Sequence, residues 1–155
     1  MVHEDSALSP RRNEQVAEAG SALAGMVIPL EPRPPIFVID RDGGDLLAFE
    51  TVVAAAGFME PPEVKEGAYL VFDADAHEAV PGVRGWDVEL ASWSPDPRQS
   101  ELRALLVGFL SEHEIDLGSD ARFDDVVGEA AEVARRLDAD RIRPRFVSRW
   151  RPRRT

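Results

Sequence analysis

The sequence of 155 residues contains no cysteine. This absence excludes a disulfide framework, a thiolate metal site and a cysteine nucleophile, and it gives no support to export into an oxidising compartment. The chain also has no apolar run approaching 18 residues, and its start lacks a basic segment followed by an apolar one. We therefore expect a soluble, cytoplasmic protein without a membrane partner.

Histidine and catalytic motifs are also scarce. The three histidines are His3, His77 and His113, and no two have the i, i+4 spacing typical of a metal site on a helix. His113 continues an apolar stripe, which favours an ordinary residue at the edge of a core over a ligand or a base. The sequence has no P-loop, GxGxxG, GxSxG or HExxH motif. It predicts no enzyme, no catalytic residue, no metal and no cofactor.

Aspartates gather in two loops, residues 40–45 and 73–75. EF-hand counting from Asp40 or Asp73 puts unsuitable residues at the glycine and bidentate glutamate positions. Turns in which a carboxylate accepts backbone N–H bonds are therefore favoured over calcium sites. A hydrolase that uses two aspartates would need a pocket that the sequence does not reveal, because no carboxylate stands in a clearly apolar context.

Charge is distributed unevenly along the chain. Residues 1–140 hold all 29 acidic residues and eleven of the 18 lysines and arginines, a formal charge of −18, whereas residues 141–155 hold seven arginines and no acid, a formal charge of +7. An acidic body attracts basic partners and repels nucleic acid and membrane surfaces.

The arginine-rich tail has the opposite preference. Its aromatic residues Phe146 and Trp150 lie between arginines, which is typical of a segment that binds nucleic acid or another anionic surface. The candidate anion-binding residues are Arg145, Arg149, Trp150 and Arg151. Docking of the tail on an acidic protein surface, of this chain or another, and the absence of a specific role remain alternatives.

The centre of the chain is rich in strand formers. We expect strands at 36–40, 46–50, 68–73, 77–80 and 86–93. The glycines of RDGGD suit a hairpin after the first strand, and Thr51 suits the N-cap of a short helix that Pro61 and Pro62 end. Pro81 and Gly82 are expected to end the fourth strand.

The strand 86–93 carries the candidate binding residues. Alternation predicts that Trp86, Val88 and Leu90 face the core, and that Asp87 and Glu89 face outward together with Trp93. An aromatic residue beside two carboxylates could form a patch that binds a partner. The alternative is that Trp93 packs under the next helix and the two acids only solvate an edge.

Two C-terminal helices complete the expected fold. Asp96 and Pro97 suit the start of the first, Gly118 its end, and Ser119 or Asp120 the cap of the second. Their apolar stripes are Leu102, Leu105, Leu106, Phe109 and Leu110 in the first helix, and Phe123, Val126, Val127, Ala130, Ala134 and Leu137 in the second.

The predicted fold is α+β: an antiparallel sheet of four to five strands with a short inserted helix and two C-terminal helices packed on one face. Residues 25–140 form this single domain, residues 1–24 are a weakly helical or disordered segment, and residues 141–155 are the tail. Strand order and oligomeric state are left open.

The segment 49–74 fits a spaced pattern of cap, turn and aromatic residues. The matching positions are Phe49, Thr51, Ala55, Phe58, Met59, Glu60, Pro61, Glu63, Val64, Gly67, Tyr69, Phe72, Asp73 and Ala74. This pattern resembles that of small uncharacterised bacterial proteins, which in size and acidity are similar to immunity proteins of polymorphic-toxin systems. Ala76 departs from it, standing where the pattern has a turn glycine. The matching residues are of structural types, so the resemblance implies no functional residue.

These observations favour a non-enzymatic, acidic protein that masks a protein partner, such as a basic toxin domain. The alternatives are an adaptor or chaperone for an effector, and a nucleic-acid-associated regulator that acts through the tail.

Overall fold

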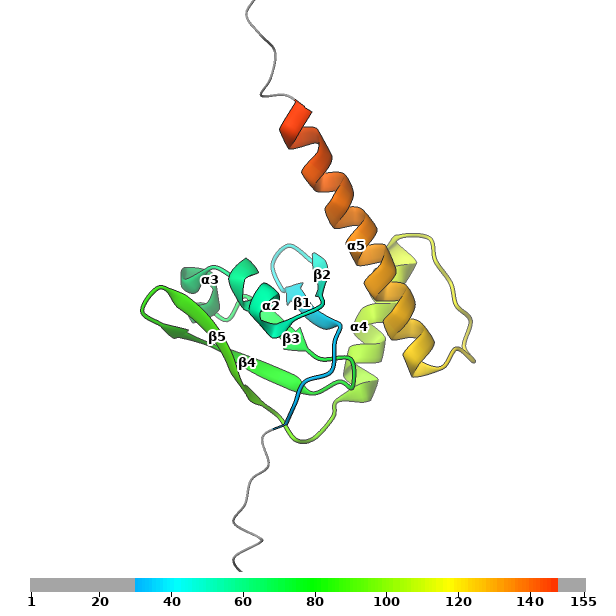
Figure 1. The fold of residues 1–155 in the computed structure, drawn as a ribbon. Coiled ribbons are helices and arrows are strands. Elements are labelled where there is room, and N and C mark those ends of the chain that lie inside the picture. Colours follow the sequence, from blue (N-terminus) through cyan, green and yellow to red (C-terminus); the bar gives the residue numbers. More distant parts are fainter. Residues whose placement is uncertain (1–29, 148–155) are drawn as a thin grey trace, which may run out of the picture. The chain divides into compact units, whose positions relative to one another are not determined.

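The structure is a computed structural model, which describes residues 30–147 (Figure 1). The predictions for residues 1–24 and 148–155 lie outside this range. In chain order the elements are β1 (Ile36–Asp40), β2 (Leu46–Phe49), α2 (Val52–Phe58), α3 (Pro61–Lys65), β3 (Tyr69–Phe72), β4 (Glu78–Arg84), β5 (Asp87–Trp93), α4 (Gln99–Glu112) and α5 (Phe123–Val147).

The strands form one antiparallel sheet in the order β2-β1-β3-β4-β5. Successive side chains of a strand point to opposite faces, so Ile36 and Val38 enter one hydrophobic cluster while Phe37 and Ile39 enter another. The expected α+β fold with an antiparallel sheet is confirmed, and β2 and β5 are the two edge strands.

Helices cover both faces of the sheet (Figure 1). The C-terminal helices α4 and α5 pack on the face of Phe37 and Phe72, and the apolar stripes expected for both helices line this cluster. The short helices α2 and α3 cover the face of Ile36 and Val38. Burial of each large apolar side chain contributes about 1.5–3 kcal/mol, so each helix is fixed mainly by its apolar face.

Thr51 caps α2 as expected, because its hydroxyl accepts a hydrogen bond from the amide of Ala54 at 3.1 Å. The prediction of a single inserted helix was incomplete. Pro61 does not simply end helical structure but occupies the first position of α3, where a missing N–H costs nothing.

Helix α4 begins and ends at residues other than those expected. Backbone bonds from Ser94 to Glu78 and from Arg98 to Ala76 hold the preceding segment, so the helix starts at Gln99 with Arg98, not Asp96, at the cap position. Helix α5 likewise starts at Phe123, beyond the caps expected at Ser119 or Asp120, and continues to Val147 into the arginine-rich tail.

Helix α4 ends well before Gly118. Glu114 has a φ of +61°. The amide of Ile115 donates a hydrogen bond to the carbonyl of Leu110 at 2.9 Å, and the amide of Glu114 donates one to the carbonyl of Ser111 at 3.1 Å. This pair of bonds is a Schellman motif, in which the left-handed residue is usually glycine. A glutamate therefore occupies a position that glycine would fill with less strain.

We expect Glu114→Gly to stabilise the protein by about 1 kcal/mol, because it relieves the left-handed conformation at an exposed position. Urea denaturation of the two proteins measures this difference. The matched control is Glu112→Gly, inside the last turn of α4, which is expected to destabilise by roughly 0.5–1 kcal/mol. Equal destabilisation by both substitutions would contradict the assignment of this helix end.

The only tyrosine of the chain, Tyr69, is buried, and its hydroxyl donates a hydrogen bond to the Glu63 carboxylate. Burial first, and then the Glu63 carboxylate, raise the pKa of Tyr69 to about 12. Because the folded pKa lies above the unfolded value near 10, the folded state retains the proton over this window. Its stability therefore falls as the pH rises from 10 towards 12.

Absorbance at 295 nm follows this single phenol directly. We expect its titration midpoint to lie well above 10 in the folded protein and to return to about 10 in urea. In Glu63→Gln the pKa should fall but stay above the unfolded value, because burial is the larger cause. A folded-state midpoint near 10 would contradict the buried hydrogen bond.

Candidate partner-binding groove

The β4–β5 hairpin closes with a two-residue turn, Gly85 and Trp86, between the paired residues Arg84 and Asp87. Gly85 has a φ of +64°, a conformation that suits glycine at the first position of such a turn. The prediction that Trp86 faces the core was wrong, because the residue belongs to the turn and its side chain is 89% exposed. An exposed indole at a hairpin tip is available to a partner.

A β-bulge interrupts the hairpin farther from the turn. Val80 pairs with Ser92 and Gly82 with Glu89, so two residues of β5, Leu90 and Ala91, face Pro81 alone. The expected end of β4 at Pro81 was therefore wrong. Around Pro81, β4 pairs only with β5, because β3 pairs with Glu78 and Ala79 alone. The bulge accommodates Pro81, which has no N–H to donate to a neighbouring strand.

The bulge also changes the direction of Trp93. The extra residue shifts the alternation, so Trp93 packs against the same cluster as Leu90, and its indole N–H donates to the Leu90 carbonyl at 3.2 Å. The expected outward face of Asp87, Glu89 and Trp93 is thus not formed. Trp93 is partly buried on the α2/α3 side, and not under α4 as the alternative had it.

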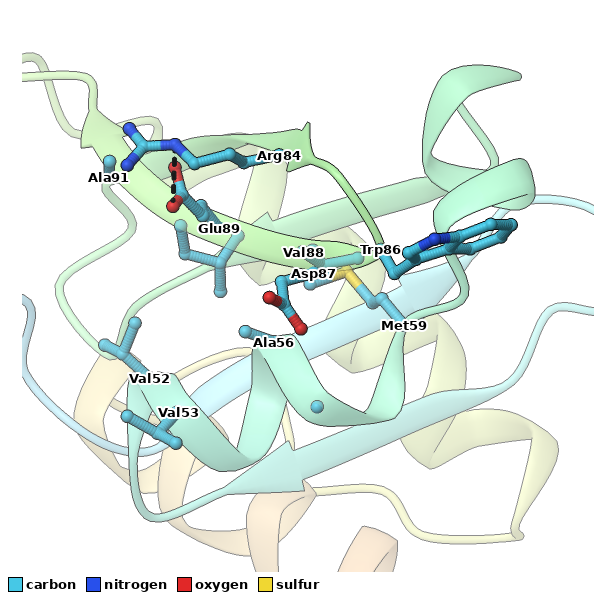
Figure 2. A pocket seen from close by; sticks show the side chains of 12 residues that line it. Val52, Val53, Ala56, Met59, Arg84, Trp86, Asp87, Val88, Glu89 and Ala91 are labelled. Carbon is cyan, nitrogen blue, oxygen red and sulfur yellow. Dashed lines mark ion pairs between the residues drawn. The ribbon is translucent and has the colours of Figure 1, made fainter.

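An open groove of about 690 Å³ lies between α2 and β5 (Figure 2). Its lining residues are Val52, Val53, Ala56, Gly57, Met59, Arg84, Trp86, Asp87, Val88, Glu89, Leu90 and Ala91. Val53 is 82% exposed on the helix side, and Trp86 stands at the hairpin end. The groove therefore combines a largely apolar lining with two exposed apolar side chains.

The two walls of the groove differ in kind. On α2 it is lined by residues 52, 53, 56 and 57, which share one face of a helix, whereas on β5 it is lined by all residues from 87 to 91. Side chains of a strand alternate between its two faces, so a groove on one face would meet every second residue. The consecutive residues 87, 88 and 89 all line the groove before the bulge is reached, which indicates that the groove runs along the outer edge of the strand.

Acidic groups dominate the charge around this groove. Arg84 forms an ion pair with Glu89 at 3.3 Å. Asp87 has no ion-pair partner among the side chains that the structure describes. Beyond Met59, at the end of α2, the segment 60–66 adds three glutamates and one lysine. The unpaired charge on this side is therefore negative.

Of the predicted binding residues, the structure brings Asp87 and Glu89 together on the groove and leaves Trp93 out of it. Sequence reasoning missed Trp86 and Val53. The turn glycine in Arg84-Gly85-Trp86-Asp87 was a signal that could have placed Trp86 in a hairpin loop.

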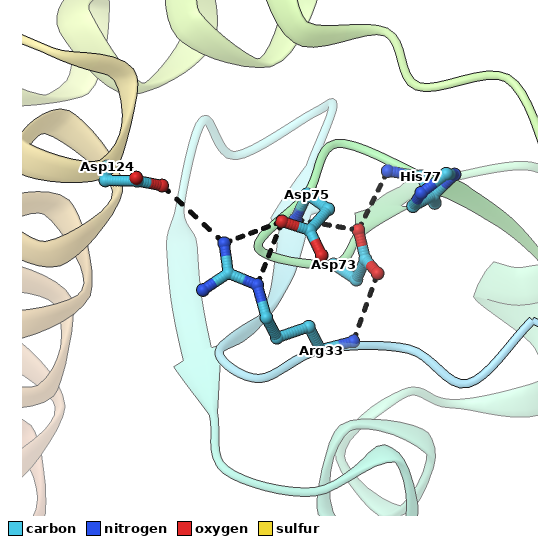
Figure 3. Close-up of polar contacts among 5 residues, drawn as sticks. All are labelled: Arg33, Asp73, Asp75, His77 and Asp124. Atoms are coloured by element: carbon cyan, nitrogen blue, oxygen red, sulfur yellow. Dashed lines mark hydrogen bonds and ion pairs between the residues drawn. The ribbon is translucent and has the colours of Figure 1, made fainter.

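A second polar cluster surrounds the loop between β3 and β4 (Figure 3). Asp73, only 1% exposed, accepts bonds from the amides of Asp75 at 3.0 Å, His77 at 2.8 Å and Arg33 at 3.1 Å. The Arg33 side chain bonds Asp75, which raises the pKa of the arginine, and reaches Asp124 at 3.6 Å. The hydrogen bonds and ion pairs described for Arg33, Asp73 and Asp75 all join residues of the fold to one another, so we assign this cluster a structural role.

The other aspartate loop is also a turn. The Asp40 carboxylate accepts bonds from the amides of Asp42 at 2.9 Å and Gly43 at 3.1 Å, as the turn interpretation predicted. Within residues 30–141, no group of three or more histidine, aspartate or glutamate side chains could hold a metal ion.

A smaller cavity of about 280 Å³ lies between the β1–β2 loop and α4 and α5. His113 lies at its edge, with its ring 4.8 Å from that of Phe109 in an edge-on arrangement, and Arg141 forms an ion pair with Asp45 at 2.7 Å. Two of the charged side chains that line this cavity, Asp45 and Arg141, are thus paired with each other.

The candidate anion-binding residues of the tail are not placed by the structure. Arg149, Trp150 and Arg151 lie outside the described residues, and Arg145 lies in the last part of α5, where only the backbone is described. None of the described helices has the length and apolarity needed to cross a bilayer. Comparisons of the chain with protein-family models, curated proteins and solved structures find no match.

Proposed function

We propose that this protein is a non-enzymatic, acidic binding protein that masks a protein partner through the groove between α2 and β5. The single observation that carries the proposal is the exposed Trp86 beside an apolar groove with an unpaired Asp87. Tryptophan is enriched among residues that dominate binding energy, and flanking charge speeds and orients association. Masking requires only a complementary surface.

The charge of the body supports a basic partner. Residues 1–140 carry a formal charge of −18, which favours approach of a positively charged domain at low salt. The resemblance of segment 49–74 to small bacterial proteins similar to immunity proteins points to a toxin domain as that partner. The absence of cysteine suits a reducing compartment such as the cytoplasm, where we place this function.

The test compares full-length wild type with the double variant Asp87→Lys/Glu89→Lys. Each is used to capture partners from the native host at low salt, and the captured protein is then purified and titrated against both. We expect the double variant to bind at least tenfold more weakly. The matched control, Glu112→Lys/Glu132→Lys, changes the net charge equally at exposed positions of α4 and α5 and should bind within twofold of wild type.

Equal weakening by both double variants would assign the effect to net charge and remove the groove from the proposal. Capture of nucleic acid alone by the full-length protein would contradict the masking function and would move the function to the arginine-rich tail.

A further inference from the structure

We propose that the groove takes an extended segment of the partner as an additional strand on β5, and that this segment alternates basic and apolar residues. The proposal rests on the proposed function and specifies how the partner binds. In this mode main-chain hydrogen bonds supply affinity, and pockets for alternate side chains supply specificity.

The strand β5 lies at an edge of the sheet. This strand is the last in the sheet order, so no described strand pairs with its outer side. In a two-residue hairpin the flanking residues, here Arg84 and Asp87, exchange backbone bonds with each other. The next residue, Val88, therefore directs its N–H and C=O away from β4, towards the groove that it lines.

The β-bulge limits where a new strand can pair. Past Glu89 the bulge disrupts the strand, and the Leu90 carbonyl already accepts the indole N–H of Trp93. The segment open to pairing is thus Asp87–Glu89, on the hairpin side of the bulge. Pairing this short needs side-chain anchors, which Val53 and Trp86 offer on either side of the groove.

The charge of β5 indicates which occupant its edge can take. If a second copy added its own β5, Asp87 and Glu89 of both copies would lie close together, and like charges across strands are destabilising. Asp87 has no described ion-pair partner and Glu89 is paired only with the exposed Arg84, so this edge favours basic side chains on an incoming strand, while Val52 and Ala56 offer apolar contact to the residues between them. Charge complementarity therefore selects a basic, alternating segment of another protein.

The probe is a ten-residue peptide that alternates lysine and valine, with blocked ends, added to the full-length ¹⁵N-labelled protein. We expect chemical-shift changes confined to residues 52–57 and 84–91, and hydrogen exchange of the Val88 amide slowed at least tenfold at saturation. Methylation of every second peptide nitrogen should weaken binding at least tenfold, because it removes the donors that pair with β5. A glutamate–valine peptide should bind at least tenfold more weakly.

Unchanged exchange at Val88 with saturating peptide, or equal binding of the methylated peptide, would overturn strand addition. The two proposals fail separately. One outcome is that charge reversal at Asp87 and Glu89 weakens binding of the purified partner while the bound partner leaves hydrogen exchange of the Val88 amide unchanged. In that case the groove binds the partner in another mode, and only this inference is wrong. If charge reversal leaves partner binding unchanged, the proposed function itself is wrong.

Discussion

Replacement of Trp86 by alanine is expected to weaken binding of the partner about 30-fold, the effect of about 2 kcal/mol typical of a tryptophan that anchors an interface. The side chain is 89% exposed in the free protein, so almost all its burial would come from the partner. For the same reason the substitution should change the free energy of unfolding by less than about 0.5 kcal/mol. Calorimetric titration and urea denaturation measure the two quantities.

The matched control is Val80→Ala. Val80 is 71% exposed on the neighbouring strand β4 but does not line the groove, so its loss should change affinity less than twofold. Similar losses for both variants would indicate a general apolar contribution of the hairpin and would remove Trp86 as an anchor.

Replacement of Asp73 by alanine is expected to destabilise the fold by about 4 kcal/mol. Three backbone amides, those of Arg33, Asp75 and His77, would lose a charged acceptor in a buried site. Each unsatisfied buried donor costs about 1–3 kcal/mol, and partial relaxation makes the sum less than additive. Urea denaturation of the variant measures the loss.

Two further variants separate the causes. Asp73→Asn keeps the shape and one acceptor oxygen but turns an N–H donor toward one of the three amides, so it should cost about half as much. Asp75→Ala removes only the half-exposed ion pair with Arg33 and should cost less than about 1 kcal/mol. A loss at Asp75 as large as that at Asp73 would contradict the role of the buried carboxylate.

The sequence was sufficient for most of the sheet and for the faces of the C-terminal helices, because periodic burial and turn residues carry that information locally. Ile36–Asp40 and its glycine turn form a hairpin as expected, and the stripe beginning at Leu102 is buried. Helix ends were less predictable. Gly118 was expected to end α4, but Glu114 adopts the left-handed conformation several residues earlier.

The candidate site depended on a feature that a single strand does not reveal. A bulge is a property of two strands in register, and only the pairing of Val80 with Ser92 and of Gly82 with Glu89 shows that β5 holds an extra residue. That one residue moves Trp93 to the buried side. The groove itself requires α2 to lie beside β5, a contact between segments some 30 residues apart in the sequence.

The spaced pattern of segment 49–74 is explained by structure. Thr51 caps a helix, Glu63 accepts the Tyr69 hydroxyl, and Asp73 organises a loop. Ala76, at the position of the pattern's turn glycine, has a φ of +69°, so the backbone keeps the glycine-like conformation although the residue differs. These residues have structural roles, and the β5 wall of the groove lies entirely beyond the segment that they occupy.

The most direct test of the proposed binding groove is a hydrogen-exchange footprint of the purified partner on the full-length protein. Binding is expected to slow exchange in residues 84–91 and 52–57, with the largest change at Val88, and to leave α4 unchanged. Protection concentrated on α4, or spread along residues 141–155 with no change in β5, would contradict the claim that this groove is where the partner binds.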